Sequence, residues 1–324
     1  MRTLTIALLS FAIACSTETG DGDPLPGAPD AGTGGDTDAR PPGGPDAGDT
    51  PRPDAGVPVS YPCEPNAVSG HHKVTCDDGL TVDVQASAAC VGGGCGLIMD
   101  LHGLTGTAEV AETHTRLRVL GPAAGYIVIQ PTSPGELHEW SSGMFDDAVW
   151  SFVQATRDRF HVDPDRVHVT GFSQGGMMTL RLLCDHADEL ASVAPAAGGG
   201  CFGSGAPSVP RPILYMHGTE DPIVSFSSGA LTRDGAILAY GLGAGEVFAG
   251  NDGYTATRWR GDDGEVLLEF WEHGFTAPPL FGFYEVGGHC LPGPLTDDDF
   301  RCRGAGQFDH SVELLRFFAE HPRR

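Results

Sequence analysis

A short turn between an apolar strand and a helix constrains the fold of this chain more than any other stretch. Residues 167–169 read Val-His-Val, residues 170–176 read Thr-Gly-Phe-Ser-Gln-Gly-Gly, and a helix-forming run follows directly. Glycines at 171 and 175 leave room for a turn so tight that Ser173, between them, takes a strained backbone conformation. Such a turn, a nucleophile elbow, raises the serine hydroxyl above the edge of a sheet.

Strands and helices alternate on both sides of this turn. Apolar runs predict strands at residues 81–85, 97–101, 126–130, 167–171, 192–195, 213–217, 266–271 and 280–286. Helices are expected at about residues 145–153, 175–188, 227–241 and 310–320. This alternation is typical of a single α/β domain with a mostly parallel sheet and helices on both faces, in which functional groups lie beyond the carboxyl ends of the strands.

Residues 1–14 have the pattern of an export signal. A basic start precedes an apolar run at residues 4–13, which is too short to span a bilayer as a helix. The run ends Ala-Ile-Ala-Cys, which resembles the lipobox of bacterial lipoproteins, in which Cys15 would be lipidated. The alternative is an ordinary signal peptide that is cleaved after a small-x-small triplet. We expect an exported protein, lipid-anchored at the bacterial cell envelope or secreted.

Residues 15–60 are expected to be a disordered linker that begins with the lipidated cysteine. The sequence Pro-Asp-Ala-Gly occurs at residues 29–32, 45–48 and 53–56, and large apolar residues are almost absent. Such a segment cannot bury enough surface to offset the entropy of ordering it. A coil of this length would reach about 35–40 Å, so it would hold a domain at residues 61–324 away from a membrane.

Cysteine usage supports export. Besides Cys15, the chain has an even number of cysteines, which in an exported protein suggests disulfides. Sequence proximity favours the pairs Cys63–Cys76, Cys90–Cys95, Cys184–Cys201 and Cys290–Cys302. Zinc ligation would need paired spacings such as Cys-x-x-Cys, which do not occur, so no metal is expected.

The chain is strongly acidic. Its formal net charge is −24, and residues 16–60 hold only nine of the acidic side chains, so most of the negative charge lies in the segment from residue 61 onward. A domain of this charge repels nucleic acid and anionic lipid headgroups. We therefore expect uncharged substrates, no nucleic-acid partner, and membrane contact only through the N-terminal lipid.

A serine hydroxyl needs a neighbouring base, and the base needs an acid to orient it. Asp221 comes just past the expected strand at 213–217, where a loop can direct its side chain across the site. Its neighbour Glu220 is the less suitable acid. An Asp-Pro turn without catalytic meaning is the alternative reading of Asp221.

The expected base is His289. It follows the strand expected at 280–286, after two glycines that permit a sharp exit toward the serine. The alternative is His310, at the start of the last helix, where histidines are more often capping or surface residues.

Two backbone N–H groups are expected to bind the oxyanion of a tetrahedral intermediate. One belongs to Gln174, the residue after the nucleophile, and the other to Leu104, in the loop after the strand at 97–101. Each such donor can lower the barrier by about 3–4 kcal/mol. His102, which opens the His-Gly-Leu sequence of this loop, is expected to be structural rather than catalytic.

Residues from about 80 to 320 resemble the secreted α/β-hydrolases identified as polyhydroxybutyrate depolymerases and feruloyl or acetylxylan esterases. The matching pieces are Leu-His-Gly at 101–103, Asp-Asp-Ala-Val at 146–149, Asp-Pro-Asp-Arg-Val at 163–167, Gly-Phe-Ser-Gln-Gly-Gly-Met-Met at 171–178, Val-Ala-Pro at 193–195, His-Gly-Thr-Glu-Asp-Pro at 217–222 and Gly-Gly-His-Cys-Leu-Pro-Gly at 287–293. The resemblance implies an α/β-hydrolase fold for residues 61–324, the triad Ser173, Asp221 and His289, and a serine esterase that needs no cofactor.

The substrate implied by the resemblance is an uncharged ester, attached to a polymer or part of one: a feruloyl or acetyl ester on polysaccharide, or a polyhydroxyalkanoate-type polyester. Related proteins often carry tryptophan where this chain has Leu291, so Trp140 is a candidate replacement wall for the substrate, with a packing tryptophan at the base of a loop as the alternative. The candidate substrate contacts are Trp140, His102 and Leu291. The alternatives are a serine peptidase on the same triad, or a surface-tethered binding protein without catalysis.

Overall fold

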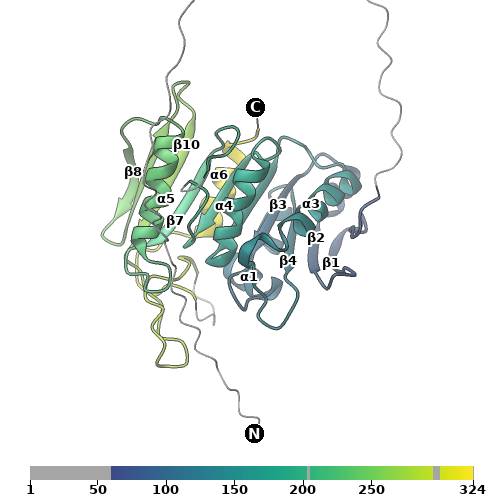
Figure 1. The fold of residues 1–324 in the computed structure, drawn as a ribbon, viewed down its shortest axis with the longest axis horizontal. Helices are drawn as coiled ribbons and strands as arrows, with labels where there is room; N and C mark the ends of the chain where they lie inside the picture. The colour runs from purple at the N-terminus through teal and green to yellow at the C-terminus, as the bar shows by residue number, and fades with distance from the viewer. Residues whose placement is uncertain (1–59, 203–204, 295–299, 324) are drawn as a thin grey trace, which may run out of the picture. The chain divides into compact units, whose positions relative to one another are not determined.

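A ten-stranded sheet forms the centre of the computed structural model, which describes residues 60–202, 205–294 and 300–323 (Figure 1). The strand order is β1-β2-β4-β3-β5-β6-β7-β10-β9-β8. The strands are β1 (Gly70–Thr75), β2 (Thr81–Ala86), β3 (Gly96–Leu101), β4 (Tyr126–Thr132), β5 (Val167–Phe172), β6 (Ser192–Ala196), β7 (Ile213–Gly218), β8 (Glu246–Asn251), β9 (Tyr254–Arg260) and β10 (Val266–His273).

The middle of the sheet is parallel and its two edges are antiparallel. Strands β4, β3, β5, β6, β7 and β10 pair in parallel, whereas β1 and β2 at one edge and β8 and β9 at the other pair antiparallel. The parallel strands β3 to β7 are buried along their whole length, which is why they read as nearly continuous apolar runs in the sequence.

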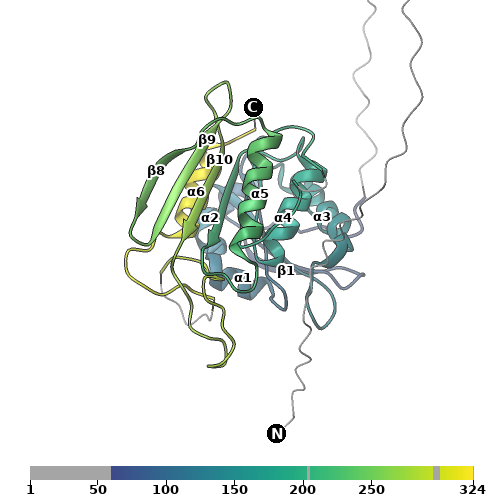
Figure 2. The ribbon, with the colours of Figure 1, turned by 60° about the vertical axis from the view of Figure 1, so that its left-hand side comes forward.

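Helices cover both faces of the sheet (Figures 1 and 2). The helices are α1 (Ala108–Thr115), α2 (Leu117–Ala123), α3 (Asp146–Phe160), α4 (Gln174–His186), α5 (Phe226–Ala239) and α6 (His310–Glu320), with the short 3₁₀ helices η1 (Ala88–Gly92) and η2 (Ser141–Gly143). Buried side chains of α3, α4 and α5 belong to one hydrophobic core, and those of α2 and α6 belong to a second core. The predicted α/β class and the predicted two-sided covering of the sheet are therefore confirmed.

One predicted strand is wrong. Residues 280–284 form a tight turn, closed by a bridge between Leu280 and Tyr284, and residues 285–286 are irregular, so no strand forms here. The apolar side chains there point outward: Phe281 is 77% exposed and Phe283 is 74% exposed. An apolar run predicts a buried strand, but here the aromatic side chains in its middle are exposed and only Val286 at its end is fully buried.

Other differences concern elements that lack a clear apolar pattern. The expected strand at 126–130 continues through Pro131 to Thr132. Strands β1, β8 and β9 were not expected, because their residues are mostly exposed or half-buried. Helices α1 and α2 were also missed. Helix α1 consists mostly of polar residues, and α2 contains a glycine and Pro122, which disfavour a helix in isolation.

Four disulfides close short loops of the domain. They join the cysteines that sequence proximity favours, namely Cys63 to Cys76, Cys90 to Cys95, Cys184 to Cys201 and Cys290 to Cys302. The predicted signal at 1–14 lies outside the described residues, as does the predicted linker apart from its last residue. Within the described residues, no helix combines the length and the apolar character that crossing a bilayer requires.

Candidate active site

Ser173 stands at a strained turn between β5 and α4. Its backbone has φ 57° and ψ −119°, a combination that residues other than glycine rarely adopt. The turn needs both flanking glycines, because a Cβ on Gly171 would lie 2.5 Å from the carbonyl carbon of Gly175, and a Cβ on Gly175 would lie 2.2 Å from the carbonyl oxygen of Leu101. This packing raises the hydroxyl at the carboxyl end of the central strand, as the sequence predicts.

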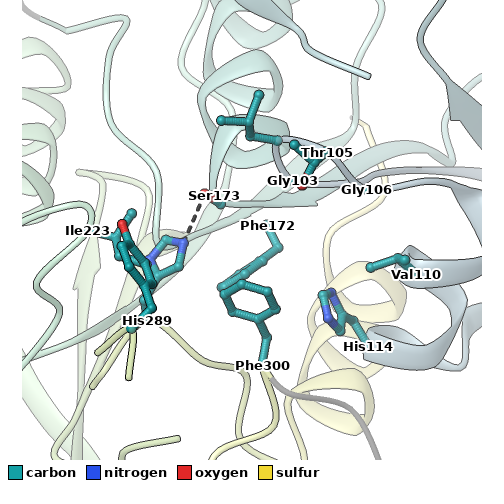
Figure 3. Close-up of a pocket in the computed structure, with 12 residues that line it drawn as sticks. Gly103, Thr105, Gly106, Val110, His114, Phe172, Ser173, Ile223, His289 and Phe300 are labelled. Atoms are coloured by element: carbon teal, nitrogen blue, oxygen red, sulfur yellow. Dashed lines mark hydrogen bonds between the residues drawn. The ribbon is translucent and has the colours of Figure 1, made fainter. Parts of the chain in front are cut away.

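The hydroxyl meets an imidazole. His289 Nε2 lies 2.9 Å from Ser173 Oγ, and His289 Nδ1 lies 2.7 Å from Asp221 Oδ2 (Figure 3). A carboxylate can only accept a hydrogen bond, so Nδ1 carries the proton and Nε2 is the acceptor for the serine hydroxyl. The three side chains therefore form one hydrogen-bonded chain, although they come from three different loops.

His289 reaches this position through a close contact between two loops rather than from a strand end. Gly288 N–H donates to the Glu220 carbonyl at 2.9 Å, and Gly287 has φ 46°. A Cβ on Gly287 would lie 2.5 Å from that same Glu220 oxygen. The two glycines thus let the histidine loop lie directly against the loop that carries Asp221.

Asp221 is held as a buried carboxylate. Its Oδ1 accepts from the backbone N–H groups of Ile223 and Val224 at 2.8 and 2.9 Å. Burial acts to raise the pKa of Asp221, but interactions with His217 and His289 outweigh it and lower the pKa to about 2. The group is therefore ionised near neutral pH and can orient the imidazole.

The loop after β3 borders the serine. A Cβ on Gly103 would lie 3.3 Å from the Ser173 Cβ, a tight contact, so the glycine lets this loop lie close to the serine. The next residue, Leu104, lines the cavity in front of the serine. Gln174 is the first residue of α4, where backbone N–H groups have no acceptor within the helix. Both N–H groups predicted to bind an oxyanion therefore belong to segments that flank Ser173.

His102 and Trp140 are buried and pack against the loop that follows β3. The Trp140 indole N–H donates to the His102 carbonyl at 2.9 Å, and its backbone N–H donates to Gln174 Oε1 at 2.7 Å. Burial lowers the pKa of His102 to about 4, so its ring is neutral near neutral pH. The expectation that His102 is structural agrees with this packing.

A mostly apolar cavity of about 250 Å³ opens in front of the serine. The rings of Phe172 and Phe300 lie between His289 and His114 (Figure 3), with Phe172 4.7 Å from the His289 ring centroid and 5.5 Å from that of His114. The lining residues are Gly103, Leu104, Thr105, Gly106, Val110, His114, Phe172, Ser173, Ile223, Tyr284, His289 and Phe300.

The three side chains suggested as substrate contacts do not line this cavity. Trp140, His102 and Leu291 are each about 1% exposed, and Leu291 packs in the core beside α6. None of the three lines the cavity, so this part of the sequence interpretation is corrected. The alternative base His310 is also buried, and burial lowers its pKa to about 4.

The cavity residues that the sequence analysis missed are mainly His114, Phe172 and Phe300. Phe172 directly precedes Ser173 in the Gly-x-Ser-x-Gly turn, so the sequence itself indicates that it lies close to the nucleophile. His114 and Phe300 come from distant parts of the chain and carry no motif that marks them.

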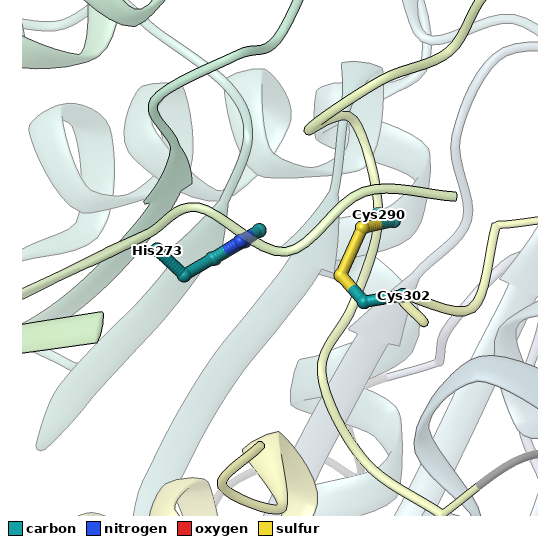
Figure 4. A group of neighbouring side chains, drawn as sticks. All are labelled: His273, Cys290 and Cys302. Atoms are coloured by element: carbon teal, nitrogen blue, oxygen red, sulfur yellow. A yellow bond between two sulfur atoms is a disulfide. The ribbon is translucent and has the colours of Figure 1, made fainter. Parts of the chain in front are cut away.

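One group of side chains has metal-ligand geometry. The ligand atoms of His273, Cys290 and Cys302 lie within 4.8 Å of one another. The two sulfur atoms form a disulfide (Figure 4), so neither offers the thiolate that a metal would need. In the oxidised protein this group is a structural link beneath the loop of His289.

The parallel sheet, the strained serine turn and the Ser–His–Asp chain define an α/β-hydrolase fold. Residues 141–240 match the family model described as phospholipase/carboxylesterase. The chain is 27% identical over 132 residues to the bifunctional acetylxylan esterase/xylanase XynS20E of Neocallimastix patriciarum, a match of 40% of this chain and 20% of that protein. It is 36% identical over 143 residues to the putative esterase NocK of Nocardia uniformis subsp. tsuyamanensis, covering 40% and 41% of the two chains.

The fold is also found in a solved structure. The acetyl xylan esterase from Aspergillus awamori superimposes with a TM-score of 0.54 at 17% sequence identity, over 63% of this chain and 93% of that chain. The chain spans less than half the length of these two curated relatives. The predicted resemblance to esterases of the α/β-hydrolase fold is confirmed.

Proposed function

We propose that the protein is an exported serine carboxylic-ester hydrolase in which Ser173 is the nucleophile, His289 the general base and Asp221 the acid that orients it. The observation that carries the proposal is that the His289 ring is hydrogen-bonded to Ser173 Oγ at 2.9 Å and to Asp221 Oδ2 at 2.7 Å. Similarity to carboxylic ester hydrolases supports the reaction class.

In the first half-reaction, Ser173 Oγ attacks the ester carbonyl carbon while its proton moves to His289 Nε2. The Asp221 carboxylate stabilises the imidazolium that forms. The carbonyl oxygen becomes an oxyanion, for which the N–H groups of Leu104 and Gln174 are the proposed donors. When the tetrahedral intermediate collapses, the alcohol leaves with the proton from His289, and the acyl group remains on Ser173.

In the second half-reaction, a water molecule takes the place of the alcohol. His289 accepts a proton from this water, which attacks the acyl carbon, and the same two N–H groups bind the new oxyanion. Collapse returns the proton to Ser173 Oγ and releases the carboxylic acid. Every proton moves between His289 Nε2 and a reacting oxygen, so this sequence uses no cofactor.

The proposed substrates are uncharged. They are feruloyl or acetyl groups joined to a polysaccharide by an ester bond, or polyhydroxyalkanoate-type polyesters. Relatives named acetylxylan esterase and feruloyl esterase support the first class. The apolar cavity beside Ser173 suits an acyl group, and the net charge of −24 disfavours anionic partners.

Export is part of the same proposal. Four disulfides are typical of proteins that fold in an oxidising compartment. We place a lipid on Cys15 and a linker at 15–60. A Cys15→Ala variant should move from the membrane fraction to the soluble fraction, as followed by immunoblotting; an unchanged membrane fraction would count against lipidation.

Hydrolysis of p-nitrophenyl acetate tests the activity. The wild type should hydrolyse it, and Ser173→Ala should lose nearly all turnover. Ser227→Ala, which removes an exposed hydroxyl on α5, is the matched control and should behave as wild type. Cleavage of peptide amides without esters would identify a peptidase instead, and hydrolysis of neither would leave a binding protein.

A further inference from the structure

A turn beside the active site displays three aromatic side chains to solvent. Phe281 is 77% exposed, Phe283 74% and Tyr284 46%. They follow one another within residues 280–284, in the long connection between β10 and α6, which extends below the sheet in Figure 1. Contiguous exposed aromatic surface of this kind marks an interaction site more often than an isolated exposed side chain does. We call residues 280–284 the aromatic turn.

The aromatic turn has a defined backbone. Leu280 N–H donates to the Tyr284 carbonyl at 2.8 Å, and Tyr284 N–H donates to the Leu280 carbonyl at 2.9 Å. At the base of the turn, Ala277 N–H donates to the Gly287 carbonyl at 2.8 Å. The ring centroids of Phe281 and Phe283 lie 6.2 Å apart, and the two ring planes are inclined by 33°. These hydrogen bonds present the two rings together on the outside of the domain.

The aromatic turn is continuous with the cavity of Ser173. Tyr284 belongs to the turn and also lines that cavity. Ile223, Leu104 and Val110, which line it as well, are 38%, 42% and 37% exposed, so the apolar surface extends outward from the serine. A molecule that lies on the turn can therefore place an attached ester at the serine.

The charge of the surroundings selects an uncharged ligand. The turn and its preceding prolines contain no Lys or Arg, and Glu285, which follows, is exposed. The chain as a whole is acidic, with a net charge of −24. Binding to an anionic membrane or an anionic polymer would need basic side chains here.

The ring faces suit sugars. A pyranose ring presents a face of C–H groups that packs flat against an aromatic ring, whereas a polyester or a lipid tail would be served equally by aliphatic side chains. Phe281, Phe283 and Tyr284 are all aromatic. The composition of the turn therefore favours stacking on sugar rings over general apolar adhesion.

We propose that the aromatic turn binds the uncharged polysaccharide that carries the ester, with pyranose rings stacked on Phe281 and Phe283 while Tyr284 connects them to the cavity. This inference rests on the proposed esterase function and names the polymer that presents the ester. The turn is a binding surface, and its side chains take no part in the chemical step.

Binding without turnover tests the inference. Ser173→Ala is run by native electrophoresis through gels that contain soluble neutral arabinoxylan, beside the triple variant that adds Phe281→Ala and Phe283→Ala. The matched control adds Leu231→Ala and Leu238→Ala, which remove two α5 side chains that are 73% and 83% exposed. We expect the dissociation constant to rise about tenfold in the first triple variant and to stay unchanged in the control. Circular dichroism checks that each variant is folded.

Equal retardation of Ser173→Ala and the aromatic variant would overturn the inference, as would the absence of any retardation. Weaker adsorption of the aromatic variant to polyhydroxybutyrate film or to phosphatidylcholine vesicles, with arabinoxylan binding unchanged, would reassign the turn to a polyester or a membrane. None of these outcomes depends on turnover. Failure of the esterase proposal would show separately, as a wild type that hydrolyses no p-nitrophenyl acetate.

Discussion

His289 Nε2 lies 2.9 Å from Ser173 Oγ, although 116 residues separate the two in the chain. This distance supports His289 as the proposed general base, whereas the alternative, His310, is buried at the start of α6. We expect His289→Ala to lower kcat for p-nitrophenyl acetate by about 10⁴-fold or more, because a serine without a base is a weak nucleophile. The steady-state rate measures this.

His310→Ala is the companion variant. His310 is buried at the start of α6, so its loss should lower the melting temperature while kcat stays within about tenfold of wild type. A His310 variant that is folded but inactive, beside an active His289 variant, would reverse the assignment.

Asp221 should make stability depend on pH in the acid range. Its pKa is lowered to about 2 in the folded protein, from an ordinary value of 3.8. A carboxyl with a depressed pKa contributes stability that is complete above about pH 4 and is lost as the pH falls through about 2; the amount is about 2 kcal/mol. Urea unfolding of wild type and Asp221→Asn from pH 5 to pH 2 should show the difference between them shrinking. A constant difference would mean that Asp221 is not held as a buried carboxylate.

Removal of the Leu104 N–H should slow the reaction. Leu104→Pro deletes the proposed oxyanion donor, and we expect kcat to fall by about 10²–10³-fold. Leu104→Ala keeps the N–H and is the control, for which the fall should stay below about tenfold. Equal losses in the two variants, with equal melting temperatures, would assign the effect to the side chain.

The Cys290–Cys302 disulfide should matter for activity as well as for stability. It begins at the residue after His289 and closes a loop with a sequence separation of 12, while Cys63–Cys76 closes one of 13 far from Ser173 in the sequence. Loops of similar length give similar entropic stabilisation, about 3 kcal/mol each. Replacing either pair by serine should lower the melting temperature comparably, but only the loss of Cys290–Cys302 should lower kcat. Equal kcat in both double variants would separate the disulfide from the positioning of His289.

The cavity should determine which acyl groups are accepted. Val110 lines it, and Val110→Trp would fill part of its volume of about 250 Å³. We expect the ratio of kcat/KM for methyl ferulate to that for p-nitrophenyl acetate to fall about tenfold, because only the larger acyl group needs the space. An unchanged ratio would mean that the acyl group does not bind in the part of the cavity lined by Val110.

The sequence predicts the proposed catalytic side chains because each carries a local signal. Ser173 lies in a turn that only its two glycines permit, and Asp221 follows a buried strand. The reasoning for His289 was partly wrong: the strand expected before it is a turn, and the glycines serve contact with the Asp221 loop. The same residue is proposed from the sequence and from the geometry, because glycine next to histidine permits a sharp turn or a close backbone contact.

The substrate surface could not be predicted in this way. Trp140 was considered for its residue type and Leu291 for its place in a family motif, yet both are buried, whereas Phe300 and His114 line the cavity without any motif. Which side chains meet at a cavity depends on how distant segments pack against one another, and local periodicity does not contain that information. The strand predicted at residues 280–286, which contains the exposed Phe281 and Phe283, is wrong for the same reason.

The backbone contact between Gly288 and Glu220 has a consequence for motion. The imidazole and the carboxylate are mounted on two loops that touch without intervening side chains, while the hydroxyl stands on the end of the central strand. A thermal displacement of these loops would therefore move Asp221 and His289 together. The contact that opens would be the one to the hydroxyl, so the histidine would keep its tautomer and return ready to accept a proton.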